Sequence, residues 1–327
     1  MRRTLALFVA VVALAGVGLP RPAGGSANSD SGYPGPTLQV SEPELTGALS
    51  CPASFSGTHE PVLLIHGTAG TGEAWSWNWL KILPPQGYDV CAVTLPDYGR
   101  ADMQVSTEYV VHAIRAMAAR SGSKVDVVGF SQGPLEPRWA IKWWPDIRNV
   151  VDDMVAVAGV GHGFTETEVI CSQSCIAPFW QMKPDSSFLA ALNAGDETPG
   201  DISYTSVYSR TDQFVWLAGG GEPWTESARL EGASNIAVQD ICPGRPVEHF
   251  QALFDAAYYG VIIDALSHPG PADVGRIDRM LCLQGAMPGV DTAEAVAKTV
   301  ELTRDLFTRT GEHHIEAEPP LAAYART

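Results

Sequence analysis

Short apolar runs that alternate with helical patterns most constrain the fold of this 327-residue chain. Residues 62–65, 90–95 and 125–130 are runs of this kind, and they are typical of strands buried on both faces of a sheet. Between the last two runs, residues 105–119 place apolar side chains at helical spacing. The pattern continues with a helix at 135–144 and strands at 154–160, 204–208 and 236–238. The alternation predicts an α/β fold, with a mainly parallel central sheet and helices on both faces.

A further helix is predicted near the C-terminus, where Asp291 or Thr292 can cap it. Its apolar residues are expected to be buried, namely Val296, Val300, Leu306 and Phe307. Its charged residues are expected to face water, namely Glu294, Lys298, Glu301 and Arg304. Core burial is also predicted for the tryptophan cluster at Trp75, Trp77 and Trp79.

The first residues have the three-part layout of a secretory signal peptide. Arg2 and Arg3 precede an apolar run at 4–19, and small residues follow at 23–27. Because the run is shorter than the roughly 20 residues that span a bilayer, a cleaved signal is favoured over a membrane anchor. We therefore expect a signal peptide at 1–27, an extended leader at 28–44, and one catalytic domain at 45–327. The protein is expected to be secreted and extracellular, with no stable membrane span, by Sec or twin-arginine export.

The charge balance argues against a nucleic-acid partner. The chain has 21 Lys+Arg against 37 Asp+Glu, a formal charge of -16, and no run of basic residues. Cleavage after residue 27 would remove three arginines and no acids, which changes the charge from -16 to -19. Such a surface repels phosphate backbones. The oligomeric state does not follow from the sequence, and a monomer is favoured.

The six cysteines are even in number, which in an oxidising compartment predicts three disulfides. On paper, six cysteines allow 15 pairings. Sequence order favours three local closures, namely Cys51–Cys91, Cys171–Cys175 and Cys242–Cys282. Cysteine and histidine are not clustered at zinc-ligand spacing, so no metal is predicted. The predicted chemistry requires no organic cofactor.

The segment Gly129-Phe130-Ser131-Gln132-Gly133 matches the nucleophile-elbow pattern GxSxG. It follows a predicted strand and precedes a predicted helix, as a sharp strand-to-helix turn requires. The glycines would let the backbone close around a strained, exposed serine. Pro137 falls early in the following helix and predicts an irregular start.

A serine nucleophile needs a base and an orienting acid, expected downstream in the order Ser, Asp/Glu, His. His249 is the favoured base because it follows a loop and precedes a long apolar stretch, with His162 as the alternative. Asp212 is the favoured acid because it comes just after the strand at 204–208. Other acids are expected at solvated ends of strands or helices, namely Asp126, Asp146, Asp152 and Asp153.

The chain resembles the lipases related to lipase B of Candida antarctica, within the α/β-hydrolase fold, over about residues 45–312. The segments that carry this resemblance, in the same order and at similar intervals, are 61–68, 131–133 followed by Trp139 and Pro145, 208–212, and 247–249. The resemblance implies Ser131 as nucleophile, His249 as general base and then acid, and Asp212 as the group that orients the imidazole. It also implies an oxyanion hole formed by Thr68 and Gln132, and disulfides Cys51–Cys91 and Cys242–Cys282.

The chain departs from that family at several positions. His66 and Phe130 stand where the yeast enzyme has a proline and a tryptophan, which predicts a differently shaped wall beside the nucleophile. Cys171 and Cys175 lie in the segment of the family's small lid, and the family's C-terminal disulfide has no counterpart here. These differences bear on substrate preference more than on the triad.

The resulting hypothesis is a secreted serine carboxylic-ester hydrolase, a lipase that cleaves triacylglycerols and other esters through an acyl-enzyme on Ser131. Its partner is an ester or lipid substrate, met at a lipid–water interface. The alternatives are a short-chain esterase, an acyltransferase on the same scaffold, and a non-catalytic lipid-binding protein. The apolar insert at about 161–200 is interpreted either as a lid or pocket wall or as ordinary packing over the end of the sheet.

Overall fold

The central feature of the molecule is a seven-stranded sheet of order β1-β3-β2-β4-β5-β6-β7. The computed structural model describes residues 34–216 and 225–326. All neighbouring strands are parallel except β1, which is antiparallel to β3. The strands are β1 (Leu49–Ser50), β2 (Val62–Ile65), β3 (Val90–Val93), β4 (Val125–Phe130), β5 (Val151–Val157), β6 (Ser203–Tyr208) and β7 (Ser234–Ala237). The predicted α/β class with a mainly parallel sheet is confirmed.

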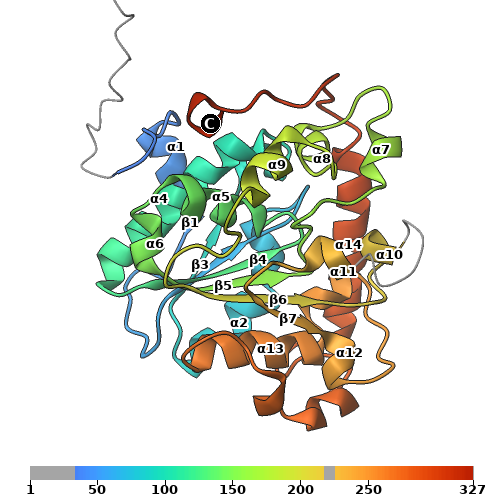
Figure 1. The fold of residues 1–327 in the computed structure, drawn as a ribbon. Coiled ribbons are helices and arrows are strands. Elements are labelled where there is room, and N and C mark those ends of the chain that lie inside the picture. The colour runs from blue at the N-terminus through green and yellow to red at the C-terminus, as the bar shows by residue number, and fades with distance from the viewer. Residues whose placement is uncertain (1–33, 217–224, 327) are drawn as a thin grey trace, which may run out of the picture.

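Helices cover both faces of the sheet (Figure 1). On one face lie α1 (Glu42–Gly47), α4 (Met103–Ser121), α5 (Leu135–Trp143) and α6 (Ile147–Val150). On the other lie α2 (Trp79–Ile82), α12 (Val238–Ile241) and α13 (Ala256–Ser267). Short helices near the carboxyl ends of the strands are α3 (Pro96–Gly99), α7 (Thr167–Ile170), α8 (Ala177–Gln181), α9 (Ser187–Asn193), α10 (Gln213–Trp216) and α11 (Thr225–Ala228). The long helix α14 (Thr292–Arg309) stands along one side of the sheet.

Strand β2 illustrates why the apolar runs form a doubly covered sheet. All four of its side chains are buried, and alternate residues point to opposite faces. Leu63 and Ile65 join the core beneath α4 and α5, whereas Val62 and Leu64 join the core beneath α13. The tryptophan cluster belongs to this second core, with Trp75, Trp77 and Trp79 at most 4% exposed, so its predicted burial is confirmed.

The C-terminal helix begins as predicted, but its predicted burial is wrong for three of the four apolar residues, and only Leu306 packs on the core. The side chain of Asp291 caps α14 by accepting a hydrogen bond from the Glu294 amide. Val296, Val300 and Phe307, however, are 53%, 65% and 70% exposed. The helix packs on the second core through Ala295, Leu302 and Leu306. Its apolar stripe is wider than this contact, and the remainder faces solvent beside the cavity described below.

The three disulfides have the predicted pairing, Cys51–Cys91, Cys171–Cys175 and Cys242–Cys282. The insert at 161–200 contains α7, α8 and α9 and combines both of its interpretations. Phe188 on α9 is fully buried and stacks on Trp139 at 4.3 Å, which is ordinary core packing. Phe164 and Phe179, in contrast, line the cavity at the end of the sheet.

At the N-terminal side, the predicted signal peptide at 1–27 lies outside the described residues. Of the predicted leader, residues 34–41 form no helix or strand, and α1 already begins at Glu42, two residues before the predicted end of the leader at 44. Within residues 34–216 and 225–326, no helix combines the length and apolar character needed to cross a membrane.

Candidate active site

Ser131 occupies a strained turn directly after β4. Its φ is +60°, in the left-handed region that is rare for a residue with a side chain. A Cβ atom on Gly129 would lie 2.5 Å from the Gly133 carbonyl carbon, and one on Gly133 would lie 2.4 Å from the Ile65 oxygen. Real Cβ atoms do not approach this closely, so both glycines of the pattern are required by the turn. The turn presents Ser131 at the carboxyl edge of the sheet, as a nucleophile elbow does.

Pro137 is compatible with a regular helix start. It is the third residue of α5, where a backbone N–H would have no acceptor within the helix. Its ring therefore removes no hydrogen bond, and the helix continues to Trp143. The predicted irregularity at this position is wrong for that reason.

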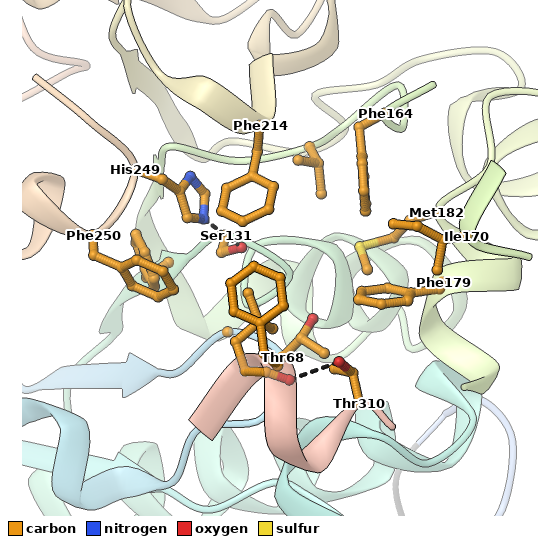
Figure 2. A pocket seen from close by; sticks show the side chains of 15 residues that line it. Thr68, Ser131, Phe164, Ile170, Phe179, Met182, Phe214, His249, Phe250 and Thr310 are labelled. Atoms are coloured by element: carbon orange, nitrogen blue, oxygen red, sulfur yellow. Dashed lines mark hydrogen bonds between the residues drawn. The ribbon is translucent and has the colours of Figure 1, made fainter. Parts of the chain in front are cut away.

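Three segments bring Ser131, His249 and Asp212 together at this edge. Ser131 Oγ lies 2.9 Å from His249 Nε2, and His249 Nδ1 lies 2.8 Å from Asp212 Oδ2. Figure 2 shows the imidazole directed at Ser131 across the cavity floor. Asp212 and His249 are 1% and 3% exposed. With Nδ1–H donating to the carboxylate, Nε2 is free to accept the serine proton.

Local hydrogen bonds fix the two partners of the serine. Asp212 follows β6, and its Oδ1 accepts a hydrogen bond from the Phe214 amide at 3.0 Å. The His249 amide donates to Gln213 Oε1 at 2.8 Å, which ties the histidine loop to the aspartate loop. The rings of Phe130 and Phe214 lie 4.9 and 4.8 Å from the imidazole and restrict its rotation. These contacts hold the imidazole in the orientation that faces Ser131.

The backbone donors predicted from Thr68 and Gln132 remain available. Thr68 follows β2 after Gly67, and a Cβ on Gly67 would lie only 2.8 Å from the Ser131 Cβ. Neither the Thr68 backbone amide nor the Gln132 backbone amide has a hydrogen-bond acceptor among the described residues. Two unsatisfied donors beside a serine can stabilise an oxyanion that forms there.

An apolar cavity of about 200 Å³ opens above Ser131. Figure 2 shows Phe164, Ile170, Phe179 and Met182 on the side away from His249, and Phe250 on the histidine side. Thr68, Thr310, Ser131 and His249 supply its polar side chains, and none of its fifteen lining residues is acidic or is a lysine or arginine. Such a cavity suits an uncharged substrate with apolar chains.

Apart from His249, the histidines that follow Ser131 in the chain have hydrogen-bond partners other than the serine. His162, the alternative base, contacts Glu197 Oε1 at 2.8 Å and the Glu226 carbonyl oxygen at 3.0 Å. The hydrogen bond to Glu197 raises the pKa of His162, which favours a structural ion pair. His268, His313 and His314 hydrogen-bond to groups on or near the surface.

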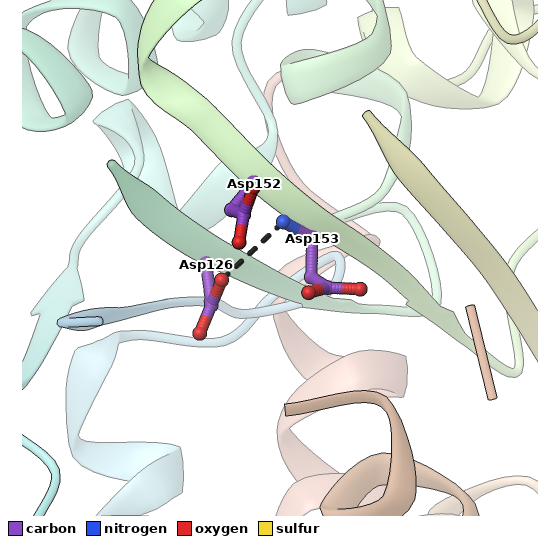
Figure 3. A group of neighbouring side chains, drawn as sticks. All are labelled: Asp126, Asp152 and Asp153. Atoms are coloured by element: carbon purple, nitrogen blue, oxygen red, sulfur yellow. Dashed lines mark hydrogen bonds between the residues drawn. The ribbon is translucent and has the colours of Figure 1, made fainter. Parts of the chain in front are cut away.

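The acidic residues beside the sheet are partly mispredicted, because Asp126 and Asp153 are only 2% and 5% exposed. They lie with Asp152 at the amino ends of β4 and β5 (Figure 3). The Asp153 amide donates to Asp126 Oδ1 at 3.3 Å, and Asp152 pairs with Lys124 at 2.8 Å. Burial raises the pKa of Asp153 to about 8 and that of Asp126 well above its usual value. Neutral carboxyls of this kind are poor cation ligands.

Two buried polar residues lie near the site: Glu136, which was not singled out from the sequence, and His66, which was noted only as a departure from the family. Glu136 is fully buried on α5 and accepts a hydrogen bond from the Gln132 side chain at 2.6 Å. His66 is fully buried after β2, where its Nε2 accepts from the Leu95 amide at 3.0 Å. The spacing of Gln132 and Glu136, four residues apart where a helix begins, is the signal that could have found the first pair.

Comparison with known proteins gives a consistent result. The family model described as lipase (class 2) matches residues 59–237. Lipase B of Pseudozyma antarctica is 33% identical over 237 residues, which are 71% of this chain and 69% of that protein. The crystal structure of Aspergillus fumigatus lipase B superposes with a TM-score of 0.83 at 30% identity, over 94% of this chain and 77% of the other. A Bacillus licheniformis lipase in its propeptide form shares the fold, with a TM-score of 0.55 at 17% identity over 69% and 55% of the two chains.

Proposed function

Because this chain belongs to the class 2 lipases, we propose that it is a secreted lipase that hydrolyses triacylglycerols and other carboxylic esters at Ser131. The chain is a serine ester hydrolase of the α/β-hydrolase fold. The observation that carries the proposal is the Ser131–His249–Asp212 relay at the floor of an uncharged apolar cavity.

The proposed mechanism begins with proton transfer from Ser131 Oγ to His249 Nε2. The serine oxygen attacks the ester carbonyl, and His249 then returns the proton to the leaving alcohol. Water repeats these steps on the acyl-enzyme and releases the fatty acid. Asp212 holds the imidazole in the productive tautomer and stabilises the imidazolium that forms.

The oxyanion of the tetrahedral intermediate is proposed to face the amides of Thr68 and Gln132. These donors follow β2 and β4, which are adjacent in the sheet, so their loops meet at one edge. Removal of a single such donor typically lowers kcat by about 10²–10³-fold. The hydroxyl of Thr68 is a third candidate donor.

Exposed apolar side chains beside the cavity support a lipid substrate over a short soluble ester. Val169 and Ile170 on α7 are 78% and 45% exposed, and Val296, Val300 and Phe307 on α14 are also exposed. Ile170 and Phe307 line the cavity itself. Val169 is the neighbour of Ile170 on α7, and Val300 and Val296 continue the exposed apolar stripe of α14 away from Phe307. We call these five residues the apolar collar. A collar of this kind fits a lipid–water interface, where its apolar side chains would leave water.

Secretion is proposed on two observations. The N-terminal residues have the composition of a signal peptide, and the described chain contains three disulfides, which persist in oxidising compartments. The acidic surface, with a formal charge of -16, is compatible with a soluble exported enzyme acting on neutral esters.

A chain-length series with collar variants tests the proposal. Wild type is expected to hydrolyse p-nitrophenyl esters from acetate to palmitate and emulsified triacylglycerol, whereas Ser131→Ala should retain its fold and lose turnover. The double variant Val296→Ser/Val300→Ser should lower the rate on the emulsion about tenfold, because less apolar surface leaves water, and leave soluble esters unchanged.

The matched control is Met280→Ser/Leu283→Ser, which removes two equally exposed apolar residues of the surface turn at 279–283. It should leave both rates unchanged. Turnover retained in Ser131→Ala would contradict the nucleophile. A wild type active only on acetate and butyrate would favour a short-chain esterase.

A further inference from the structure

A chain of two hydrogen bonds runs from the cavity into the protein interior. The Thr68 hydroxyl donates to Gln132 Oε1 at 2.6 Å, and Gln132 Nε2 donates to Glu136 Oε1 at 2.6 Å. Thr68 is half-buried at the cavity, whereas Gln132 and Glu136 are both 0% exposed. The chain therefore connects a candidate oxyanion donor to a carboxyl group that water does not reach.

Glu136 differs in its partners from the two buried acids Asp255 and Asp212. Asp255 pairs with Arg245, and Asp212 contacts His249. Glu136 is met only by the Gln132 side-chain amide and by its own backbone amide, and among the described residues nothing hydrogen-bonds to its Oε2. Burial raises the pKa of Glu136 to about 8, although the hydrogen bond from Gln132 opposes the shift. The carboxyl group therefore exchanges its proton within the pH range in which an ester hydrolase is assayed.

The groups around these two hydrogen bonds carry no charge that would compensate an ionised Glu136. His66 lies near the Gln132 amide across Gly99, and it is neutral because burial lowers its pKa to about 4. Charged groups on or beside α3 and α4 are engaged elsewhere: Arg100 with Asp97, Asp102 with Gln181, and Glu108 with the Val40 amide. On α5, Arg138 donates to Asn193 through Nη2, while its buried Nε and Nη1 have no partner among the described residues. Arg309 on α14 donates to the Ala69 carbonyl oxygen and pairs with Asp305. The protonation of Glu136 is thus governed by its burial and by the Gln132 amide.

The side chains of Thr68, Gln132 and Glu136 can form their two hydrogen bonds in two arrangements. When Glu136 is ionised, it accepts from Gln132 Nε2, so Gln132 Oε1 faces Thr68 and accepts a hydrogen bond from its hydroxyl. When Glu136 is neutral, its O–H can donate to Gln132 Oε1. This hydrogen bond requires the side-chain amide of Gln132 to be flipped, so that its oxygen and nitrogen exchange places. Gln132 Nε2 then donates to Thr68 Oγ1, and the Thr68 O–H bond can point toward the cavity.

We propose that Glu136 is a positioning residue that, in its neutral form, turns the Gln132 amide and aims the Thr68 hydroxyl at the oxyanion. The inference rests on the proposed function, in which Ser131 forms the acyl-enzyme beside Thr68. Glu136 touches no substrate and acts only through the Gln132 side chain. Ionisation of Glu136 withdraws one oxyanion donor and leaves the two backbone amides in place.

The test is the pH profile of kcat between pH 6 and 10, on a soluble p-nitrophenyl ester at saturating concentration. Wild type should lose about tenfold in kcat on an alkaline limb, with little change in KM, because the hydroxyl must break its bond to Gln132 before it can serve the oxyanion. Glu136→Gln cannot ionise, and its amide can donate to Gln132 Oε1. This variant should keep the wild-type kcat at pH 7 and lose the alkaline limb.

Two further variants make the outcome specific. Thr68→Val removes the hydroxyl that would face the oxyanion. The kcat of this variant should be low at every pH, and its pH profile should have no alkaline limb. Glu136→Leu should lower kcat about tenfold at pH 7 with KM unchanged, and thermal unfolding of each variant checks its fold. If Glu136→Leu fails to fold, the Glu136→Gln profile still decides.

An alkaline limb that persists unchanged in Glu136→Gln or in Thr68→Val would overturn the inference. That result is distinguishable from failure of the proposed function. In the first case Ser131→Ala is inactive and wild type still forms an acyl-enzyme, whereas in the second Ser131→Ala retains turnover.

Discussion

Buried carboxyl groups lie at both ends of the central sheet, but their surroundings differ. At the carboxyl end, Asp212 accepts hydrogen bonds from His249 Nδ1 and from the Phe214 amide. At the amino end, Asp153 lies beside Asp126, and its Oδ1 has no hydrogen-bond partner within the described part of the chain. The first arrangement stabilises a negative charge, whereas the second disfavours one. Burial of an acid alone therefore does not mark a functional site, and the donors that meet it decide its role.

The largest expected effect comes from removing the charge at the carboxyl end. Asp212→Asn keeps the shape of the side chain but cannot hold His249 in the tautomer that accepts the serine proton. We expect kcat to fall by about 10⁴-fold with KM little changed. Steady-state kinetics on a soluble ester measure this.

The same chemical change at the other end is the matched control. Asp153→Asn also replaces a buried aspartate, but far from Ser131, and its kcat should stay within about twofold of wild type. A comparable loss in both variants would mean that the Asp212 effect comes from general destabilisation and not from the relay.

The sequence predicted most of the carboxyl end because its chemistry has an order along the chain. Ser131 and Asp212 follow β4 and β6, and His249 comes after both, in the order expected of a hydrolase triad. Parallel strands bring their carboxyl ends to one edge. The GxSxG glycines and the three local disulfides were also predicted correctly. The glycines rest on a short-range constraint, whereas the triad and the disulfides rest on the order of these residues along the chain.

The mispredicted features depend on contacts that the sequence does not contain. Asp126 and Asp153 are adjacent only because β4 and β5 pair with a register shift after Val125. On α14, the stripe with Val300 and Phe307 has the period of a buried face, but the pattern cannot distinguish a core from a cavity mouth. The role proposed for Glu136 depends on its burial and on its hydrogen bond to Gln132, and neither is contained in the sequence.

A smaller effect is expected on stability when the charge at the amino end is removed. The pKa of Asp153 is raised to about 8 in the folded protein, so the folded state binds its proton more tightly than the unfolded chain does. Below about pH 4, both states are protonated and Asp153 costs nothing. As the pH rises from about 4 to about 8, the folded state loses stability. Asp153→Asn abolishes this loss and should stabilise the protein by on the order of 1–3 kcal/mol at pH 8.

Urea unfolding at pH 4 and pH 8 measures the difference. At pH 4 the variant should match wild type. Asp185→Asn is the control, because the Asp185 side chain is 77% exposed and its substitution should have the same small effect at both pH values. A stabilisation of Asp153→Asn that is equal at pH 4 and pH 8 would refute the charge-based explanation.

The smallest effect concerns the ion pair at the rim of the amino end. Lys124 Nζ lies 2.8 Å from Asp152, and both side chains are about two-fifths exposed, at 39% and 42%. Lys124→Met should lower the free energy of unfolding by less than about 1 kcal/mol at pH 7, and 1 M NaCl should reduce the loss.

The matched control is Lys298→Met on α14, which breaks a pair of similar exposure, Lys298–Glu301. Because Lys124 also opposes the rise in the pKa of Asp153, its removal should cost more at pH 8 than at pH 5, whereas the Lys298→Met loss should be the same at both. If the loss of stability depended on pH equally in the two variants, the carboxyl groups at the amino end would not respond to the charge of Lys124. The two ends of the sheet would then not differ in their electrostatics as argued above.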